Sequence, residues 1–478
     1  MTPIYSSMLD RREILLAGAS LATTASVLRA APAPESPIKQ FKLIAAPSRQ
    51  SIIGAHGPDT DVWSYGSNVP GPELRVRQGD RIQVQVENRL PEETTVHWHG
   101  LRVPNAMDGV AHITQKPIGP GETFTYEFDC LDAGTFWYHP HHHSSAQVAR
   151  GLYGALIVDE RNPIAVDRDI TWVLSDWRLQ KDASIKNDFN NLHDVGHNGR
   201  IGNTVTVNGR IPGNFDVRAG ERIRLRLINA ANARIFGLEF EGHTAQVIAI
   251  DGHPVEPHAP ANNRIVLGPA MRADILLDLR GQPGKRYRVV DAFYRHREYK
   301  LLDLAYSDAA QLRDLADAKP IRLPANPLSE PDLENAERHD IMLGGGMMGG
   351  MISAIMDGQR TNMRTLMHNG LLWSINGVAA KGHILDPFLT LKRNQSCRLT
   401  LINDTAWHHP MHLHGHVFRV IARNGQPTRR SEWQDTVMMD PRERVEIAFV
   451  ADNPGDWMFH CHILEHQSGG MFGLIRVI

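Results

Sequence analysis

Four histidine pairs of the form His-x-His stand out in the 478-residue sequence, which contains 25 histidines. The pairs are His97/His99, His139/His141, His412/His414 and His460/His462. Successive side chains of a β-strand point to opposite faces, so the two histidines of each pair point the same way. Neutral imidazole binds copper, zinc and iron, and this many imidazoles in one place would bind more than one metal ion. The pairs therefore predict a histidine cage for several metal ions.

A cysteine interrupts the last pair, in the segment HCHILEHQSGGM (460–471). Strand alternation turns the thiol of Cys461 to the face opposite to its histidine neighbours. Two histidines, a cysteine and a weak methionine are the ligand set of a blue-copper electron-transfer site. The candidates for such a set are His409, Cys461, His466 and Met471. A zinc ligand or a nucleophilic thiol is the alternative, although zinc makes little use of methionine and a nucleophile would not explain the cage.

A sequence unit that occurs three times carries these residues. Its copies are LRVRQGDRIQVQVEN (74–88), FDVRAGERIRLRLIN (215–229) and LTLKRNQSCRLTLIN (389–403). Each copy closes with alternating apolar residues and an asparagine, a pattern typical of a half-buried strand. Counted from that asparagine, the outer units have His-x-His where the middle unit has Leu238 and Phe240. If the outer units meet face to face, the four pairs form one cage between them.

Many short strand-like runs, separated by Gly, Pro and Asn/Asp clusters, indicate an all-β protein of three tandem β-sandwich units. We expect the units at 36–160, 161–325 and 335–478, with a polar linker over 307–339. Cys397 falls on the apolar face of its strand and is expected in the core, as is Cys130. A disulfide between these two cysteines is possible in an oxidising compartment, but nothing in the sequence supports it.

The N-terminus resembles an export signal. Arg11 and Arg12 precede an apolar run over 14–28 and an Ala31-Pro32-Ala33 site of the A-x-A type. The run is shorter than the ~20 residues that span a bilayer. We predict a twin-arginine signal peptide over 1–33 and a periplasmic protein without stable membrane insertion; an amphipathic helix is the alternative. The net charge of -2 and a pI near 7.0 give no reason to expect nucleic-acid binding, and a monomer is expected.

The sequence resembles the multicopper oxidases with three cupredoxin domains, a family that includes laccases and cuprous oxidases. The resemblance covers essentially all of the chain after the signal, and its motifs are HWHG (97–100), WYHPH (137–141), HPMHLHGHVF (409–418) and HCHILEHQSGGM (460–471). It implies three Greek-key cupredoxin-like β-sandwiches, the middle one without copper. It also implies four one-electron oxidations of a substrate coupled to the reduction of O2 to two waters.

The same resemblance implies four copper ions and their ligands. A type 1 copper would be held by His409, Cys461, His466 and Met471. A type 2 copper would be held by His97 and His412. A type 3 pair would be held by His99, His139, His141, His414, His460 and His462.

An acid beyond the first histidine motif supplies protons in related enzymes, and Asp108 in NAMDG stands at that place. Its alternative role is that of a turn residue before Gly109. Some cuprous oxidases place a carboxylate directly after the last type 1 histidine, where this chain has Gln467. Glu465 is the nearby acid, so a second proton relay stays open.

A methionine-bearing segment over 341–367 holds seven of the 16 methionines. Thioethers are soft ligands that suit Cu(I), and cuprous oxidases carry Met-rich segments in this region. Alternatively Met351, Ile355 and their neighbours fill a helix face, and the glycines form a mobile loop. The resemblance favours a laccase-like enzyme that oxidises phenols or aromatic amines. Its alternatives are a cuprous oxidase in periplasmic copper tolerance, an oxidase of Fe(II) or Mn(II), and a non-enzyme that serves as an exported scaffold or copper-binding protein.

Overall fold

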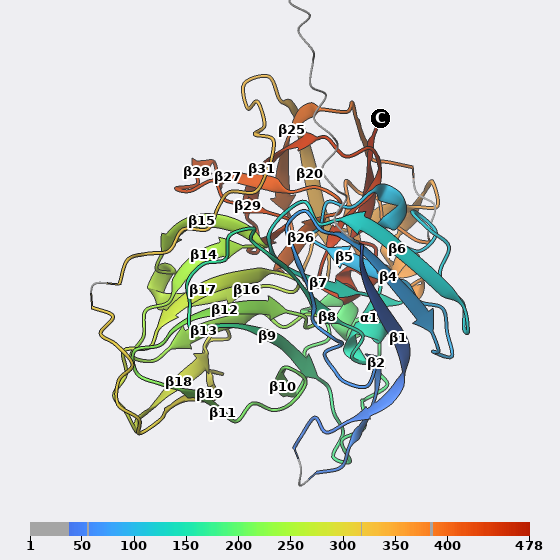
Figure 1. The fold of residues 1–478 in the computed structure, drawn as a ribbon. Coiled ribbons are helices and arrows are strands. Elements are labelled where there is room, and N and C mark those ends of the chain that lie inside the picture. The colour runs from blue at the N-terminus through green and yellow to red at the C-terminus, as the bar shows by residue number, and fades with distance from the viewer. Residues whose placement is uncertain (1–37, 55–56, 317, 383–385) are drawn as a thin grey trace, which may run out of the picture. The chain divides into compact units, whose positions relative to one another are not determined.

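The protein is described by a computed structural model over residues 38–54, 57–316, 318–382 and 386–478. The predicted export signal over 1–33 lies outside these described residues. From Ile38 to Ile478 the chain forms a single unit, in which β-sheets are stacked in pairs (Figure 1). Three such pairs follow one another along the chain.

The first pair of sheets carries the first two histidine pairs. One sheet has the order β2 (Thr60–Tyr65), β1 (Lys39–Gln50), β4 (Arg81–Asn88) and β6 (Thr123–Asp129). The other has the order β3 (Leu74–Arg77), β8 (Gly154–Asp159), β7 (Gly134–His139) and β5 (His97–His99). Strands β5 and β7 pair antiparallel with His97 opposite His139, so the two histidine pairs lie side by side on one sheet.

The second pair of sheets contains none of the predicted ligands. One sheet runs β10 (Thr204–Val207), β9 (Arg168–Trp177), β12 (Arg222–Asn229), β17 (Arg272–Asp278), β14 (Gln246–Ile250) and β15 (His253–His258). The other runs β11 (Asn214–Val217), β19 (Tyr299–Tyr306), β18 (Arg286–Asp291), β13 (Phe236–Phe240) and β16 (Arg264–Leu267). Leu238 and Phe240, which replace the histidines of the outer units, are buried in the apolar core between these sheets.

The third pair of sheets carries the remaining histidine pairs and Cys461. One sheet contains β23 (Trp373–Ile375), β20 (Glu337–Gly345), β25 (Gln395–Asn403), β31 (Arg444–Ala451), β27 (Phe418–Arg423), β28 (Gln426–Pro427) and β29 (Trp433–Gln434). The other contains β24 (Leu389–Leu391), β33 (Phe472–Val477), β32 (Gly455–Cys461), β26 (His409–Leu413) and β30 (Thr436–Met439). His412 lies opposite His460 in the antiparallel pairing of β26 with β32, which repeats the arrangement of the first unit.

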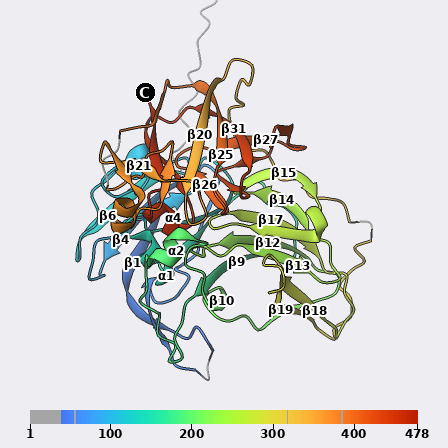
Figure 2. The same ribbon diagram turned by 180° about the vertical axis from the view of Figure 1, so that it is seen from behind.

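Among the described residues the helices are few and short. They are α1 (Ser144–Ala149), α2 (Leu192–Gly196), α3 (Met363–His368) and α4 (Leu464–Ser468), with the 3-10 turns η1 (Asn105–Met107) and η2 (Ala261–Asn263). Helix α4 contacts both α1 and α2, so elements of all three sandwiches meet at α4 (Figure 2). No helix in the described part of the chain is long and apolar enough to cross a bilayer.

Each of the three related stretches forms two strands in different sheets rather than one. A turn such as that between β3 and β4 separates them, and the alternating half follows the turn. The predicted apolar face is buried in β4 and in β25, where Cys397 is 0% exposed. Cys397 and Cys130 are both buried and unbridged. The predicted linker over 307–339 has no strand or helix among the described residues 307–316 and 318–336, but its last three residues belong to β20.

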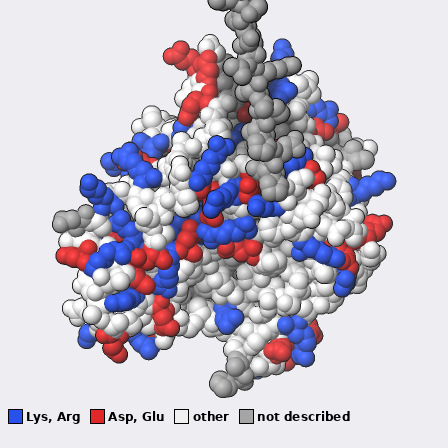
Figure 3. All heavy atoms as spheres, in the orientation of Figure 1, with Lys and Arg blue, Asp and Glu red and all other residues white. Residues whose placement is uncertain are grey.

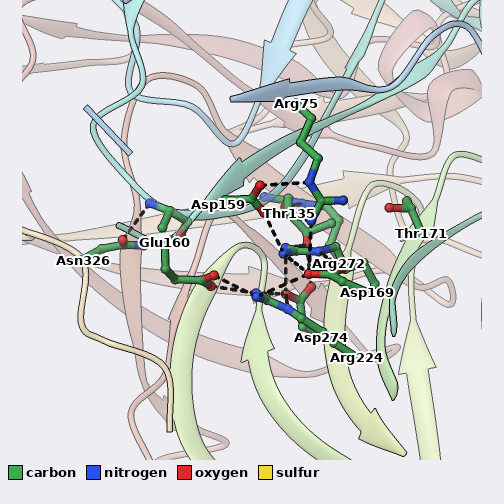
Figure 4. A network of polar contacts seen from close by, with 12 residues as sticks. Arg75, Thr135, Asp159, Glu160, Asp169, Thr171, Arg224, Arg272, Asp274 and Asn326 are labelled. Atoms are coloured by element: carbon green, nitrogen blue, oxygen red, sulfur yellow. Dashed lines mark hydrogen bonds and ion pairs between the residues drawn. The ribbon is translucent and has the colours of Figure 1, made fainter. Parts of the chain in front are cut away.

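Strand β12 differs from the half-buried strand that its alternation predicts, because both of its faces are covered. Arg224 and Arg226 are 1% and 0% exposed. Arg224 donates to Glu160 at 2.9 Å and to Asp274 at 3.0 Å (Figure 4). Arg226 donates to the hydroxyl of Thr135 at 3.0 Å. The first sandwich packs on this face and supplies part of the charge partners, which the sequence of one strand does not reveal.

The surface carries charges of both signs. On the face drawn in Figure 3, Lys and Arg alternate with Asp and Glu without a broad field of one sign. Many of these charges are paired across strands, as in the bond from Arg75 to Asp159 at 2.8 Å. Exposed pairs of this kind contribute little to stability, about 0–1 kcal/mol each.

Candidate metal centre

The eight histidines of the four pairs come together between the first and third sandwiches. Their ring nitrogens form three groups within 4.8 Å: His97/His99/His139, His97/His412/His414 and His141/His414/His460. His462 joins them, with its Nε2 3.4 Å from that of His139. Every member is buried. The predicted cage is therefore present in the structure, and both outer units contribute to it.

Hydrogen bonds on the outside of the cage fix which nitrogen faces inward. The Nδ1 of His97 donates to the carbonyl of Asp108 at 2.8 Å, and the Nδ1 of His412 donates to that of Asp435 at 2.8 Å. The Nδ1 of His460 donates to the carbonyl of Cys461 at 2.9 Å. An imidazole that donates through one nitrogen keeps a lone pair on the other, and these lone pairs point into the cage.

Several of these inner nitrogens have no hydrogen-bond partner in the part of the chain that the structure describes. The Nε2 atoms of His97 and His412 and the Nδ1 of His99 are buried without a hydrogen bond in the described residues. The Nε2 atoms of His414 and His460 face each other at 3.0 Å. Unsatisfied buried nitrogens are costly in a folded protein, and a bound cation would satisfy them. The donor set fits a cluster of metal ions.

Burial disfavours the charged form of several cage histidines. Desolvation, followed by the neighbouring imidazoles, lowers the pKa of His139, His141, His414 and His462 well below the ordinary histidine value. Desolvation disfavours the imidazolium form, and nearby positive charge disfavours it further. Metal ions bind neutral imidazole, so the burial that depresses each pKa also prepares the ligands.

A buried ion pair between the second and third sandwiches, Arg272 with Asp435, supports the cage. It was not predicted from the sequence. Asp435 accepts from the Nε2 of His99 at 3.1 Å and forms a two-pronged ion pair with Arg272 at 2.8 and 2.6 Å. Burial opposes ionisation of Asp435, but the Arg272 guanidinium outweighs it and holds the pKa of this carboxyl well below its usual range. Arg272 is itself 0% exposed. It thereby connects the middle sandwich, which has no ligand in the cage, to two of the cage histidines.

The glycine of the HWHG motif is explained by this ion pair. Gly100 has a φ of +88°, which disfavours L side chains, and a Cβ there would lie 2.3 Å from Arg272 and 2.6 Å from Asp435. The sequence offered no direct signal for Arg272, which is 163 positions from its partner. Within the predicted motif, Gly100 is the residue that must be small because Arg272 lies against it.

Asp108 lies against the cage, as predicted. Its side chain is buried and its Oδ2 accepts from the Nδ1 of His414 at 2.9 Å. Gly109 has a φ of +81°, and a Cβ there would overlap the carbonyl of Val96, so the turn interpretation also applies. Asp108 therefore combines a turn with contact to two cage histidines, since its carbonyl accepts from His97.

Both carboxylate oxygens of Glu465 accept hydrogen bonds from residues outside the cage. One carboxylate oxygen accepts from the Asn232 side chain at 2.9 Å and the other from the Arg200 backbone at 3.0 Å. Both partners belong to the second sandwich. Desolvation by burial raises the pKa of Glu465. These contacts indicate that Glu465 joins the second and third sandwiches.

A second cluster is formed by Cys461 with His409 and His466, on the opposite face of the strand from His460 and His462. The Sγ of Cys461 is 3.4 Å from the Nδ1 of His409 and 3.7 Å from the Nδ1 of His466, and the two nitrogens are 3.1 Å apart. The Nε2 atom of each histidine has a hydrogen-bond partner outside the cluster. The Thr405 hydroxyl bonds to the Nε2 of His409 at 2.8 Å, and the Nε2 of His466 donates to the carbonyl of His197 at 2.6 Å. The near nitrogens and the sulfur therefore converge on one point.

Met471 is close to this cluster through its backbone. Its carbonyl accepts from the backbone N–H of Cys461 at 3.1 Å, and its own N–H donates to the carbonyl of His466 at 3.0 Å. Its side chain is 0% exposed, in the same core as Cys461. Burial raises the pKa of the Cys461 thiol, and metal binding would release its proton because the thiolate is the ligand form.

The two clusters are covalently adjacent. His460 and His462 point into the cage, while Cys461 between them points to His409 and His466. The alternation predicted for this strand is confirmed. A cavity of about 520 Å³ reaches the cage from outside, where its wall includes His141 and Gln467. The cage thus borders this cavity at His141 on one side and is connected to the thiol cluster on the other.

Sequence and structure comparisons agree on one family. Family profiles described as multicopper oxidase match residues 48–163, 168–309 and 358–478. A multicopper oxidase of Mycobacterium tuberculosis is 31% identical over 456 residues, which cover 88% of this chain and 84% of that protein. The chain belongs to the multicopper oxidase family. It is therefore an oxidoreductase that binds copper ions and uses O2 with a reducing substrate.

Solved structures and a further relative extend the likeness. The crystal structure of a multicopper oxidase from Pseudomonas thermotolerans shares 34% identity with a TM-score of 0.79, covering 92% of this chain and 99% of that one. Copper resistance protein A of Escherichia coli is 27% identical over 563 residues, covering 90% of this chain and 91% of that protein. The fold is thus three cupredoxin-like β-sandwiches in tandem, as the sequence predicted.

Proposed function

We propose that the protein binds four copper ions and is a laccase-like oxidase of phenols or aromatic amines. A type 1 copper would be held by His409, Cys461, His466 and Met471, a type 2 copper by His97 and His412, and a type 3 pair by His99, His139, His141, His414, His460 and His462. The observation that carries this proposal is the adjacency of the thiol cluster to the cage through His460-Cys461-His462. A storage or scaffold protein would have no need of both clusters.

The grouping of the inner nitrogens supports this assignment. His97 and His412 each leave a free Nε2. His141, His414 and His460 form one trio, and His462 meets His139 close to His99. Copper bound at these places would supply one-electron redox chemistry. Four phenols would each lose an electron and a proton, and four electrons with four protons reduce one O2 to two waters.

Proton supply is the role we propose for Asp108. Replacing it with asparagine keeps an acceptor for the Nδ1–H of His414 but removes the ionisable group. We expect Asp108→Asn to lower the rate of O2 consumption about 100-fold, the usual scale of general acid catalysis. Copper content and visible absorption should stay at wild-type levels. Wild-type turnover in this variant, measured with an oxygen electrode, would remove Asp108 from the proton path.

The structure of the methionine-bearing segment supports phenols as the substrate more than Cu(I). It forms the hairpin β21 (Ser353–Met356) and β22 (Gln359–Asn362), followed by α3, instead of the helix face considered for Met351 and Ile355. Met351, Met356 and Met363 pack on a small apolar cluster around Leu366. Most of these thioethers therefore serve packing.

A cuprous oxidase is the second candidate function. Met347 and Met348 are 42% and 72% exposed, and the backbone carbonyl of Met347 accepts from Trp407, two residues before His409. Exposed thioethers near the proposed type 1 site could receive Cu(I). The relationship to copper resistance protein A supports the same alternative.

Replacing the exposed Met347 and Met348 with alanine separates these candidates. We expect kcat/KM for a phenolic donor to change less than about twofold, since surface substitutions have small effects. Met342→Ala, another exposed methionine of the segment, is the matched control. A selective loss of about 10-fold or more on chelated Cu(I) would favour the cuprous oxidase instead.

We also propose that the chain is exported by a twin-arginine signal over 1–33 and acts as a monomer in the periplasm. The domain bounds that we propose are 36–160, 161–325 and 335–478. The sheet pairing supports three units of this order, because no named sheet mixes strands from two of them.

A further inference from the structure

A cavity of about 550 Å³ lies at one end of the second sandwich, where the structure has no predicted site. Its apolar wall includes Ile201, Ile211, Tyr294 and Leu301. Cavities of roughly 300–1,000 Å³ with apolar and aromatic walls and a few polar groups are typical of small-molecule sites. The size and lining suit a single aromatic ring with a short substituent.

Two short connections join this cavity to the thiol cluster. Asn198 in its wall directly follows His197, whose carbonyl accepts from His466 at 2.6 Å. Tyr294 in its wall contacts the ring of Phe293 at 5.0 Å between centroids. Phe293 in turn contacts His408 at 5.6 Å, the residue before His409. Through Asn198 and Tyr294, the cavity wall is therefore linked to residues that adjoin or contact the two histidine ligands of the proposed type 1 copper.

The cavity wall is cationic. It contains Arg234, Arg297 and Lys300, and it contains no aspartate or glutamate. Arg234 is held by Asp176 at 2.9 Å and Lys300 by Asp303 at 2.9 Å. For the exposed guanidinium of Arg297 there is no carboxylate partner among the described residues.

Arg297 therefore leaves one uncompensated positive charge at the cavity. Arginine binds carboxylates through two parallel hydrogen bonds, a stronger and more directional contact than lysine makes. A metal cation would be repelled here, and a neutral phenol would gain a hydrogen bond from the guanidinium but no ion pair. An aromatic donor with a carboxylate would gain both ring packing and the ion pair.

We propose that this cavity binds the reducing substrate and selects aromatic donors that carry a carboxylate. The inference rests on the proposed laccase-like function and adds the substrate class to it. The ring packs on Tyr294 and the apolar wall, and the carboxylate pairs with Arg297. With copper bound at the proposed type 1 site, the donor would lose one electron to it and its phenolic proton to solvent, in the stoichiometry given above.

Steady-state oxidation of 4-hydroxycinnamate and of its methyl ester by the copper-loaded enzyme tests the charge selection. We expect the wild type to favour the acid and Arg297→Gln to lower the acid-to-ester ratio of kcat/KM about 10-fold, the loss of one charged hydrogen bond. Arg295→Gln, in the same loop but outside the wall, should keep the wild-type ratio. Ile211→Trp should raise KM for both donors, because it fills the mouth of the cavity.

Calorimetric titration of 4-methoxycinnamate into copper-free protein gives a readout that does not depend on turnover. Binding should weaken about 10-fold in Arg297→Gln and remain unchanged in Arg295→Gln. An acid-to-ester ratio and a binding affinity that are equal in Arg297→Gln and wild type would overturn the cavity inference and leave the oxidase proposal standing. Copper-loaded wild type that oxidises neither donor, while still binding 4-methoxycinnamate, would count against the laccase-like proposal alone.

Discussion

Cys461→Ser is expected to abolish the blue absorption of the copper-loaded protein and its oxidation of every reducing substrate. The Sγ lies 3.4 and 3.7 Å from the two Nδ1 atoms that complete its cluster. A serine hydroxyl does not ionise at neutral pH and offers no sulfur orbital to copper, so the site loses both its charge and its colour. The cage histidines on the opposite strand face keep their ligand atoms. Copper analysis should show the loss of one copper equivalent, and O2 consumption should fall to background.

Cys397→Ser is the matched control for this experiment. Cys397 is also 0% exposed in the core of the third sandwich, but it lies on β25, in the other sheet from Cys461. Burying a hydroxyl there should cost about 1–3 kcal/mol of unfolding free energy and leave colour and activity intact. A blue Cys461→Ser protein, or a colourless Cys397→Ser protein that is still folded, would contradict the assignment of the thiol ligand.

The ligands could be predicted from the sequence because each signal was local. The period of two along a strand places His460 and His462 on one face and Cys461 on the other, without any knowledge of the fold. Comparison of the three repeats then showed that the outer units carry the same pairs. The structure confirms this separation, since His460 meets His414 while Cys461 meets His409.

The groups that hold the ligands could not be predicted in the same way. The partner of His466 is a backbone carbonyl of the second sandwich, that of His197, and every residue has such a carbonyl. Asp435 reaches His99 from 336 positions away, with no spacing rule to suggest it. The arginines of β12 alternate with apolar residues and therefore looked solvent-facing, because the covering sandwich is absent from a single strand's pattern. The groups that hold these metal-binding histidines come from distant parts of the chain, and only tertiary packing brings them together.

Arg272→Met is expected to damage the cage while sparing the thiol cluster. It leaves Asp435 as an unpaired buried carboxylate next to His99 and His412. Breaking a buried ion pair costs roughly 3–5 kcal/mol, and loss of a group that orients metal ligands lowers affinity or activity about 10- to 100-fold. We expect reduced copper in the cage, an altered paramagnetic signal of the type 2 copper and slower O2 reduction. The blue absorption should persist, because within the described residues Arg272 makes no hydrogen bond or ion pair with the Cys461 cluster.

Arg224→Met distinguishes this positioning role from stability alone. Arg224 is equally buried, in the same sheet of the second sandwich, and its ion pairs are with Glu160 and Asp274 (Figure 4). Its loss should lower the unfolding free energy by a similar amount, yet Asp435 keeps Arg272 and the cage should keep its copper and its paramagnetic signal. If both variants lose stability and both retain the type 2 copper signal, Arg272 only stabilises the contact between the second and third sandwiches. If Arg272→Met alone perturbs the type 2 copper, the middle sandwich helps to build a site to which it gives no ligand.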